Sequence, residues 1–315
     1  MSASSPVATK DKLKECSLED RHPRSWIGNT HYIATTALDD ANRREMCIEA
    51  EFGRASDDYG TQSKSTDPAQ KLRIFNMASP KLIVHHLQVG QGERIPWLLE
   101  ELNLPYELKL YQRAPLLAPP ELQAVYPIGA SPVLEDLTDP SHPIKFAESG
   151  AICEYVIHKY GNGRLALKPE DKNYADYLYW LHFSNATLNA GIFRRAMARN
   201  MVGEEDMRYK GNDARVVNTL EHVNNRLKEN KWLAGEEFTA ADIMTGWCFT
   251  TMRKFEPIDL TPYDGIMAWL KRIGERKAYR TAMAKSDPDL DIEAGLSVKG
   301  PPMHEVWAKV MGSKP

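Results

Sequence analysis

The pattern of apolar and polar positions divides the chain into three stretches. Through residues 1–76, charged and small polar residues interrupt every apolar run, and such a composition buries too little apolar surface to order a chain. We predict that 1–76 is a disordered extension. A second explanation is that the extension results from the choice of start codon, since Met77 directly precedes the ordered pattern.

The second stretch alternates strand and helix patterns. β-Branched and alternating runs predict strands at 81–87, 106–111, 131–137 and 144–148. Amphipathic spacing and prolines predict helices at 93–104, 119–126 and 149–161. The opening strand–helix–strand order implies two parallel strands joined by a right-handed crossover. We therefore expect a compact α/β domain over 80–163.

The third stretch has helical periodicity throughout. Its apolar positions predict helices at 172–201, 213–232, 238–255 and 263–285. Thr239 and Asp242 have the spacing of a capping box, with Asp in place of the usual Glu. We expect a helical domain over 170–286, followed by a tail over 287–315 that docks on the body of the protein through Val306, Trp307 and Val310.

Composition excludes several classes of protein. A length of 315 residues suits about two domains, and a formal net charge of -3 argues against a general nucleic-acid partner. No apolar run approaches the roughly 18 residues of a membrane span, and the N-terminus lacks the order of a secretory signal. The four cysteines are widely spaced, which fits free thiols in a reducing compartment. We therefore expect a cytoplasmic protein.

Two short segments carry the candidate binding chemistry. In GASPVLED, Ser131 and Pro132 enter a strand, and because Pro132 cannot donate a ladder hydrogen bond, the neighbouring backbone is free to pair with a ligand. In IKFAESGAICEYV, Glu148 and Ser149 stand where a strand is followed by a helix. The amides of a helix N-terminus favour a carboxylate, and Glu148 can bind an ammonium group. This pattern suits a small zwitterionic peptide.

These segments, together with LAGEEFTAADIM, resemble the cytosolic glutathione transferases over residues 81–285. Within that family, the segments VHHL, ERIPWLLEELNLPYELKLYQR and LAPPEL are most similar to a fungal and bacterial branch. The resemblance implies a thioredoxin-like N-terminal domain followed by an all-helical C-terminal domain. It also implies glutathione as co-substrate and a homodimer as the assembly.

The resemblance assigns roles residue by residue. Pro132 matches the cis-proline of the family, and the backbone of Ser131 would pair with the cysteinyl part of glutathione. Glu148 and Ser149 match the pair that holds the γ-glutamyl ammonium and carboxylate. Without the family, Ser149 would be interpreted as an ordinary helix cap, Glu148 as a solvated acid and Pro132 as a trans residue.

The group that would activate the glutathione thiol is missing from the expected place. The family puts a Tyr, Ser or Cys between the first strand and the first helix, but here residues 88–94 read QVGQGER. Gly90 stands at the Ser position and Gln91 near the Cys position. Three alternatives are open: the backbone amides of Gly90 to Gly92, a side-chain amide of Gln88 or Gln91, or a helical-domain residue such as Tyr179 or Asn185.

The expected activity is attack of glutathione thiolate on a small apolar electrophile held between the two domains, in detoxification or secondary metabolism. Conjugation is the expected reaction, and isomerisation, elimination or peroxide reduction would use the same thiolate. The alternative is a non-catalytic glutathione- or ligand-binding regulatory protein of the same fold, which Gly90 favours. No metal site is expected, because His85 and His86 point to opposite faces of a strand, one packed and one exposed.

Overall fold

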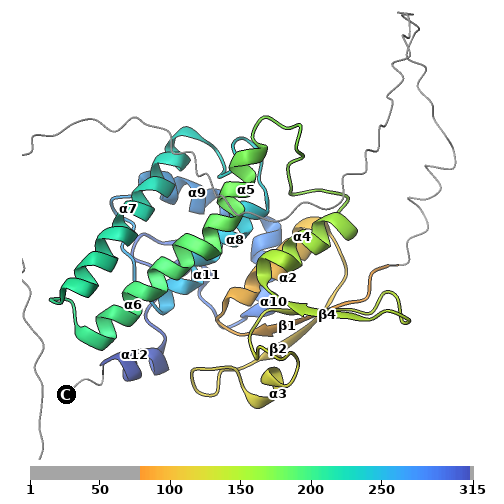
Figure 1. The fold of residues 1–315 in the computed structure, drawn as a ribbon, viewed down its shortest axis with the longest axis horizontal. Coiled ribbons are helices and arrows are strands. Elements are labelled where there is room, and N and C mark those ends of the chain that lie inside the picture. The colour runs from red at the N-terminus through yellow and green to blue at the C-terminus, as the bar shows by residue number, and fades with distance from the viewer. Residues whose placement is uncertain (1–78, 313–315) are drawn as a thin grey trace, which may run out of the picture. The chain divides into compact units, whose positions relative to one another are not determined.

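The computed structural model describes residues 79–312 (Figure 1). The predicted extension over 1–76 lies outside these residues. The described residues belong to one compact unit, in which a small sheet with its helices precedes a larger set of helices. Within this part of the chain, no helix is both long and apolar enough to cross a membrane. The predicted fold class is confirmed, while the domain boundaries 80–163, 170–286 and 287–315 stay predictions.

Four strands form one sheet in the order β2-β1-β3-β4. The first domain contains β1 (Leu82–Leu87), α2 (Arg94–Leu102), β2 (Glu107–Tyr111), α3 (Pro120–Gln123), β3 (Val133–Asp136), β4 (Ile144–Ala147) and α4 (Ser149–Lys159). As predicted, β1 and β2 run parallel, whereas β3 is antiparallel to both β1 and β4. His85 is paired with Val133, so the end of β1 lies beside the start of β3. This register brings the loop after β1 next to Ser131.

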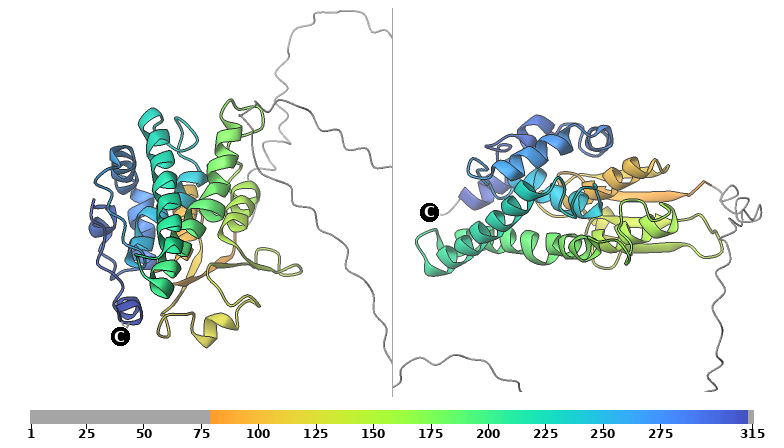
Figure 2. Two further views of the ribbon diagram at one scale, coloured as in Figure 1. Left: turned by 60° about the vertical axis from the view of Figure 1, so that its left-hand side comes forward. Right: turned by 90° about the horizontal axis from the view of Figure 1, so that it is seen from above.

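The helices of the second domain lie to one side of the strands (Figure 2). In chain order they are α5 (Tyr174–Phe183), α6 (Ala190–Val202), α7 (Met207–Glu229), α8 (Ala240–Phe249), α9 (Asp264–Gly274), α10 (Lys277–Ser286), α11 (Ile292–Leu296) and α12 (Glu305–Gly312). The docking of Trp307 is confirmed, because its ring centroid lies 5.8 Å from that of Phe255.

One predicted helix, over 263–285, is two helices in the structure. The backbone of Arg276 is extended, with φ -76° and ψ 120°, and this residue separates α9 from α10. A Cβ on Gly274 would lie only 2.6 Å from the side chain of Leu296, which packs against the end of α9. The Gly274 carbonyl accepts a hydrogen bond from Arg280, so the helix end keeps a partner.

Helix α2 packs on two sides at once, against the sheet domain and against α8 and α10. Trp97 makes the contact with α8: a Cβ on Gly246 would lie 2.8 Å from the Trp97 ring, so only glycine permits this approach. Glu101 accepts two hydrogen bonds of 2.6 Å from Arg276 and one of 3.0 Å from Trp97. The start of α2 is therefore fixed relative to both domains.

His85 and His86 are both buried, so the prediction that one would be exposed was wrong. The two rings do point to opposite faces, but each face supplies a polar partner. The His85 ring nitrogens lie 2.9 Å from the Tyr111 hydroxyl and from Glu135, and His86 lies 3.0 Å from Asp287. Over the described range 79–312, no three His, Cys, Asp or Glu side chains are grouped to hold a metal.

The capping box at the start of α8 is confirmed, and it connects three segments. The fully buried Asp242 carboxylate accepts hydrogen bonds from the amides of Thr239 and Leu233, both at 3.0 Å. The Trp269 indole donates a third at 2.9 Å. Asp242 therefore joins α8 to the loop before it and to α9.

Replacing Asp242 by alanine should lower the free energy of unfolding by about 2–4 kcal/mol, because a cap is lost and two buried donors are left unpaired. Urea denaturation followed by circular dichroism measures this change. Asp264→Ala is the matched control, since Asp264 is 76% exposed and its pair with Lys228 is a solvent-exposed ion pair of the kind that contributes little to stability. Equal losses in the two variants would contradict the connecting role of Asp242.

Candidate functional site

A cavity of about 460 Å³ lies between the two domains. Its walls come from the loop after β1, the loops before α3 and before β3, the chain after α5, and helices α6 and α8. The lining residues are Leu87, Gly90, Gln91, Arg113, Leu117, Ala118, Gly129, Ala130, Ser131, Asn185, Asn189, Ala190, Phe193 and Trp247. Apolar side chains and a few polar groups together are typical of a small-molecule site.

Two glycines shape the loop between β1 and α2. A Cβ on Gly90 would lie 2.7 Å from the Leu87 carbonyl oxygen, and one on Gly92 would lie 2.5 Å from His86 and 2.7 Å from the Ser131 hydroxyl. A side chain at Gly90 would therefore displace backbone, and one at Gly92 would displace the side chains of His86 and Ser131. This close packing places the loop against Ser131. Within the described residues, the amides of Gly90, Gln91 and Gly92 have no hydrogen-bond acceptor.

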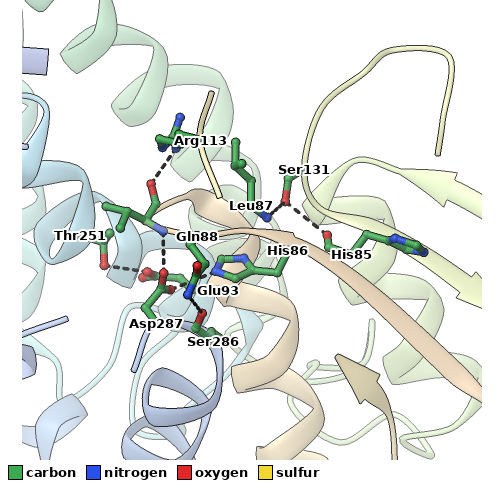
Figure 3. Close-up of polar contacts among 11 residues, drawn as sticks. His85, His86, Leu87, Gln88, Glu93, Arg113, Ser131, Thr251, Ser286 and Asp287 are labelled. Atoms are coloured by element: carbon green, nitrogen blue, oxygen red, sulfur yellow. Dashed lines mark hydrogen bonds and ion pairs between the residues drawn. The ribbon is translucent and has the colours of Figure 1, made fainter. Parts of the chain in front are cut away.

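Val89, in the same loop, has the left-handed conformation with φ 53°, which is rare for a β-branched residue. Its amide donates a hydrogen bond of 2.6 Å to Asp287, directly after α10. Its carbonyl accepts one of 2.7 Å from Arg113, directly after β2. Figure 3 shows Arg113 and Asp287 on opposite sides of this loop. Both peptide groups that flank the Val89 Cα are therefore held by charged side chains.

Three ionisable groups are buried beneath the loop: His86, Glu93 and Asp287 (Figure 3). Burial, together with the nearby charge of Asp287, raises the pKa of Glu93 to about 8. The Thr251 hydroxyl donates a hydrogen bond of 2.6 Å to Glu93 and only partly offsets this effect. Glu93 is therefore mainly protonated and uncharged at neutral pH.

Arg94 connects the loop to α4 and to the helical domain. Its fully buried guanidinium donates hydrogen bonds to Gln91 at 3.0 Å, to Ser149 at 3.2 Å and to Asn185 at 2.9 Å. It also lies 5.2 Å from the centre of the Trp247 ring. Across residues 79–312 no carboxylate lies within ion-pair distance of it, and burial lowers its pKa. Its positive charge is therefore not neutralised by a neighbour.

No described side chain caps the amides at the N-terminus of α4. Glu148, at the N-cap position, is exposed and has φ 75°, and its carboxylate makes no capping hydrogen bond. Ser149 is the first helical residue, and its hydroxyl accepts from Arg94 and from Asn185. The interpretation of Ser149 as an ordinary cap is therefore wrong, and the first-turn amides remain available to an anion.

The structure brings some of the predicted residues together and separates others. Gly90, Gln91, Ser131 and Asn185 line the cavity, and the Ser131–Pro132 peptide is cis. The Gln88 side chain instead donates to the Ser286 carbonyl at 3.3 Å. Pro132, Glu148 and Ser149 lie outside the lining, although Ser149 is joined to Gln91 through Arg94.

Tyr179 does not reach the cavity, so its suggested role at the thiol is wrong. It is 49% exposed, and its hydroxyl lies 3.0 Å from His222 of α7. Asn185 and Asn189 reach the cavity from a π-helical turn, Ser184–Asn189, between α5 and α6. Such turns often occur at functional sites. The sequence shows only a continuous helical pattern here.

Sequence reasoning also missed Arg94, Arg113 and Asp287. One sequence signal concerned Arg94: the predicted helix over 93–104 has an apolar face, yet it begins with two charged residues, Glu93 and Arg94. The two described thiols lie in the core, where burial raises the pKa of Cys153 to about 12 and that of Cys248 to about 11. Neither is a candidate nucleophile. A larger hollow of about 750 Å³ beside α9 and α10 is lined by charges of both signs and lies away from these groups.

Comparisons with known proteins identify the family of the chain. A model of the glutathione S-transferase N-terminal domain matches residues 91–164, and one of the C-terminal domain matches 193–277. Glutathione S-transferase 3 of Schizosaccharomyces pombe is 30% identical over 249 residues, covering 71% of this chain and 98% of that one. The Escherichia coli disulfide-bond oxidoreductase YfcG is 30% identical over 203 residues, covering 62% and 91%. A glutathione S-transferase structure from Actinobacillus pleuropneumoniae superimposes with a TM-score of 0.60 at 29% identity, covering 67% and 95%.

Replacing Glu93 by glutamine should flatten the pH dependence of stability. Because the pKa of Glu93 is about 8 in the folded state and near 4.5 when unfolded, its contribution is complete below pH 4.5 and is lost as the pH rises to about 8. The lost free energy is of order 5 kcal/mol, at about 1.4 kcal/mol for each pKa unit.

Urea denaturation at a series of pH values measures this effect. Glu93→Gln should gain stability relative to the wild type between pH 5 and 8, a window that follows from the shifted pKa. Glu107→Gln, at a 61% exposed side chain, is the control and should follow the wild-type curve. A Glu93→Gln curve that keeps the wild-type slope would show that Glu93 ionises normally.

Proposed function

Because the chain belongs to the glutathione S-transferase family, we propose that it binds glutathione beside Ser131 and α4 and uses the bound thiolate on a small apolar electrophile. The observation that carries the proposal is the convergence of three sets of backbone groups without partners in the described chain. These are the amides of Gly90 to Gly92, the backbone of Ser131 and the first-turn amides of α4. A peptide ligand offers matching groups.

The charged groups around the start of α4 support one orientation of bound glutathione. The uncompensated Arg94 guanidinium lies behind Ser149, where the dipole and amides of α4 also favour an anion. The γ-glutamyl carboxylate would lie at this point. The exposed Glu148 carboxylate, directly before it, would bind the γ-glutamyl ammonium group. The backbone of Ser131, beside the cis-proline, would pair with the cysteinyl part.

This orientation directs the cysteinyl sulfur toward the loop at Gly90. We propose that the free amides of Gly90 to Gly92, at the start of α2, stabilise the thiolate in place of a side-chain hydroxyl. Hydrogen bonds and dipoles at such a position lower a thiol pKa from about 8.5 to about 7 or below. Gln91 is the alternative donor, since its side-chain oxygen is held by Arg94 and its amide group is not.

The rest of the cavity suits an apolar acceptor. Leu117 and Phe193 are 72% and 54% exposed and line the cavity from different domains, and Trp247 lines it from α8. Their arrangement supports a flat or aromatic electrophile between the domains. A homodimer, a cytoplasmic location and a role in detoxification or secondary metabolism belong to the same proposal and rest on the family alone.

A non-catalytic glutathione-binding protein is the rival. A panel assay distinguishes the two, using glutathione with an aryl halide for conjugation and with a small disulfide for thiol–disulfide exchange. The disulfide is included because one relative is named a disulfide-bond oxidoreductase. Turnover of either substrate supports the enzyme, whereas tight glutathione binding with neither activity supports the rival.

Replacing Ser149 by alanine should weaken glutathione binding roughly tenfold or more, because hydrogen bonds to charged groups are the stronger class. Isothermal titration with glutathione measures the dissociation constant. The matched control is Ser141→Ala, which removes an exposed hydroxyl bonded to Asp139 and should change nothing. Unaltered affinity in Ser149→Ala would place the γ-glutamyl carboxylate elsewhere.

Replacing Gly90 by serine should not create the hydroxyl donor that the family usually has at this position. Its Cβ would lie 2.7 Å from the Leu87 oxygen, so the loop must move and thiol activation should fall by roughly tenfold or more. Turnover and the pH dependence of thiolate absorbance for bound glutathione measure the change. Gln91→Ala separates the remaining donors: a raised thiol pKa in this variant would favour the Gln91 side chain over the backbone amides.

A further inference from the structure

We propose that Asp287 and Arg113 are positioning residues for the thiol-activating loop, because together they hold Val89 in its left-handed conformation and so fix the amides of Gly90 to Gly92. The inference rests on the proposed function of those amides. It adds two residues from distant segments, one after α10 and one after β2, to the machinery of the site.

Val89 would not adopt this conformation unaided. A left-handed backbone is disfavoured for a residue with a Cβ, and most of all for a β-branched one, by roughly five- to a hundredfold in population. Such a conformation persists only where the surroundings impose it. With φ at 53°, Val89 stands directly before Gly90, so a change at Val89 redirects every following amide of the loop.

Two hydrogen bonds to charged side chains impose the left-handed conformation of Val89. Asp287 accepts from the Val89 amide at 2.6 Å, which fixes the peptide plane before the Cα. Arg113 donates to the Val89 carbonyl at 2.7 Å, which fixes the plane after it. Because the two planes determine φ and ψ, these contacts leave Val89 a single conformation. Hydrogen bonds with a charged partner are strong enough for this task.

Each anchor is itself held in place. Asp287 is 3% exposed and its second carboxylate oxygen lies 3.0 Å from His86. Arg113 donates a further hydrogen bond of 2.7 Å to the Leu116 carbonyl, and its guanidinium lies 5.0 Å from the centre of the Phe255 ring. The loop geometry is therefore imposed from outside the loop, on both sides.

The contact of Asp287 with His86 allows a purely structural explanation, in which the carboxylate only supplies a hydrogen-bond partner to a buried ring. The two explanations differ in what glycine at position 89 would do. Glycine adopts a positive φ without cost. If Asp287 acts through Val89, a glycine there should make the carboxylate dispensable; if Asp287 acts only through His86, it should not.

The experiment compares wild type with Asp287→Ala, Arg113→Ala, Val89→Gly and the two double variants that carry Val89→Gly. The readouts are the thiol pKa of bound glutathione, from thiolate absorbance against pH, and kcat and KM for glutathione with an aryl halide. Each single anchor variant should raise the thiol pKa toward about 8.5 and lower kcat roughly tenfold, with KM changing by less than about threefold. Val89→Gly should restore both values to within about threefold in each double variant.

Asp136→Ala is the matched control. Asp136 is also buried and also accepts a backbone hydrogen bond, from Thr138 at 3.0 Å, but it pairs with Leu82 at the other end of β1. It should lose stability without a change in thiol pKa. Anchor variants that fold and keep the wild-type thiol pKa, or double variants no better than the single ones, would overturn the positioning role. A wild type that does not lower the thiol pKa would instead overturn the proposed function.

Discussion

The packing of α2 between the sheet and the helical domain is the contact on which the rest of the structure depends. Trp97 reaches α8 only because Gly246 has no side chain, and Glu101 ties the far end of the helix to Arg276. The start of α2 is thus set by both domains together. The position of the segment from Gly90 to Arg94, of which Gly90 and Gln91 line the cavity, follows from that placement.

The site that results is built mainly from backbone. Gly90 and Gly92 bring the chain so close to Leu87 and Ser131 that amides occupy the place of a side chain. The charges around it are unequal: Glu93 is kept neutral by burial, whereas Arg94 stays cationic with hydrogen bonds to uncharged partners. The consequence is a buried positive charge directly behind Ser149, at the start of α4.

Much of the fold could be predicted from the sequence, because the strands and most helices have an unambiguous apolar period. The break at Arg276 could not, since it depends on Leu296, which packs against Gly274 from a later segment. The burial of both His85 and His86 could not be predicted either, because their polar partners are remote in sequence. Local patterns carry no information about such contacts.

The candidate site, like the fold, could be predicted only where the signal is local in sequence. Ser131 and Glu148 are marked by local signals, a proline and a helix start, but their expected roles came from the family resemblance. Arg94 and Asn185 are not marked in this way, because a charged residue on a helical pattern is normally solvated and becomes a connector only through tertiary packing. The sequence showed that Gly90 lacks the hydroxyl expected at this position. The steric reason, the closeness of the Leu87 carbonyl oxygen, could be recognised only in the structure.

The hydrogen bond between Val89 and Asp287 spans 198 positions of the chain, and this separation has a consequence for biosynthesis. At about 5–20 residues per second, a ribosome needs roughly 10–40 seconds to reach the second partner after making the first. During that interval the loop after β1 stays without this anchor. A competent site is therefore a property of the nearly finished chain, because a product that ends before α10 lacks both the Asp287 anchor of Val89 and a helix against which α2 packs.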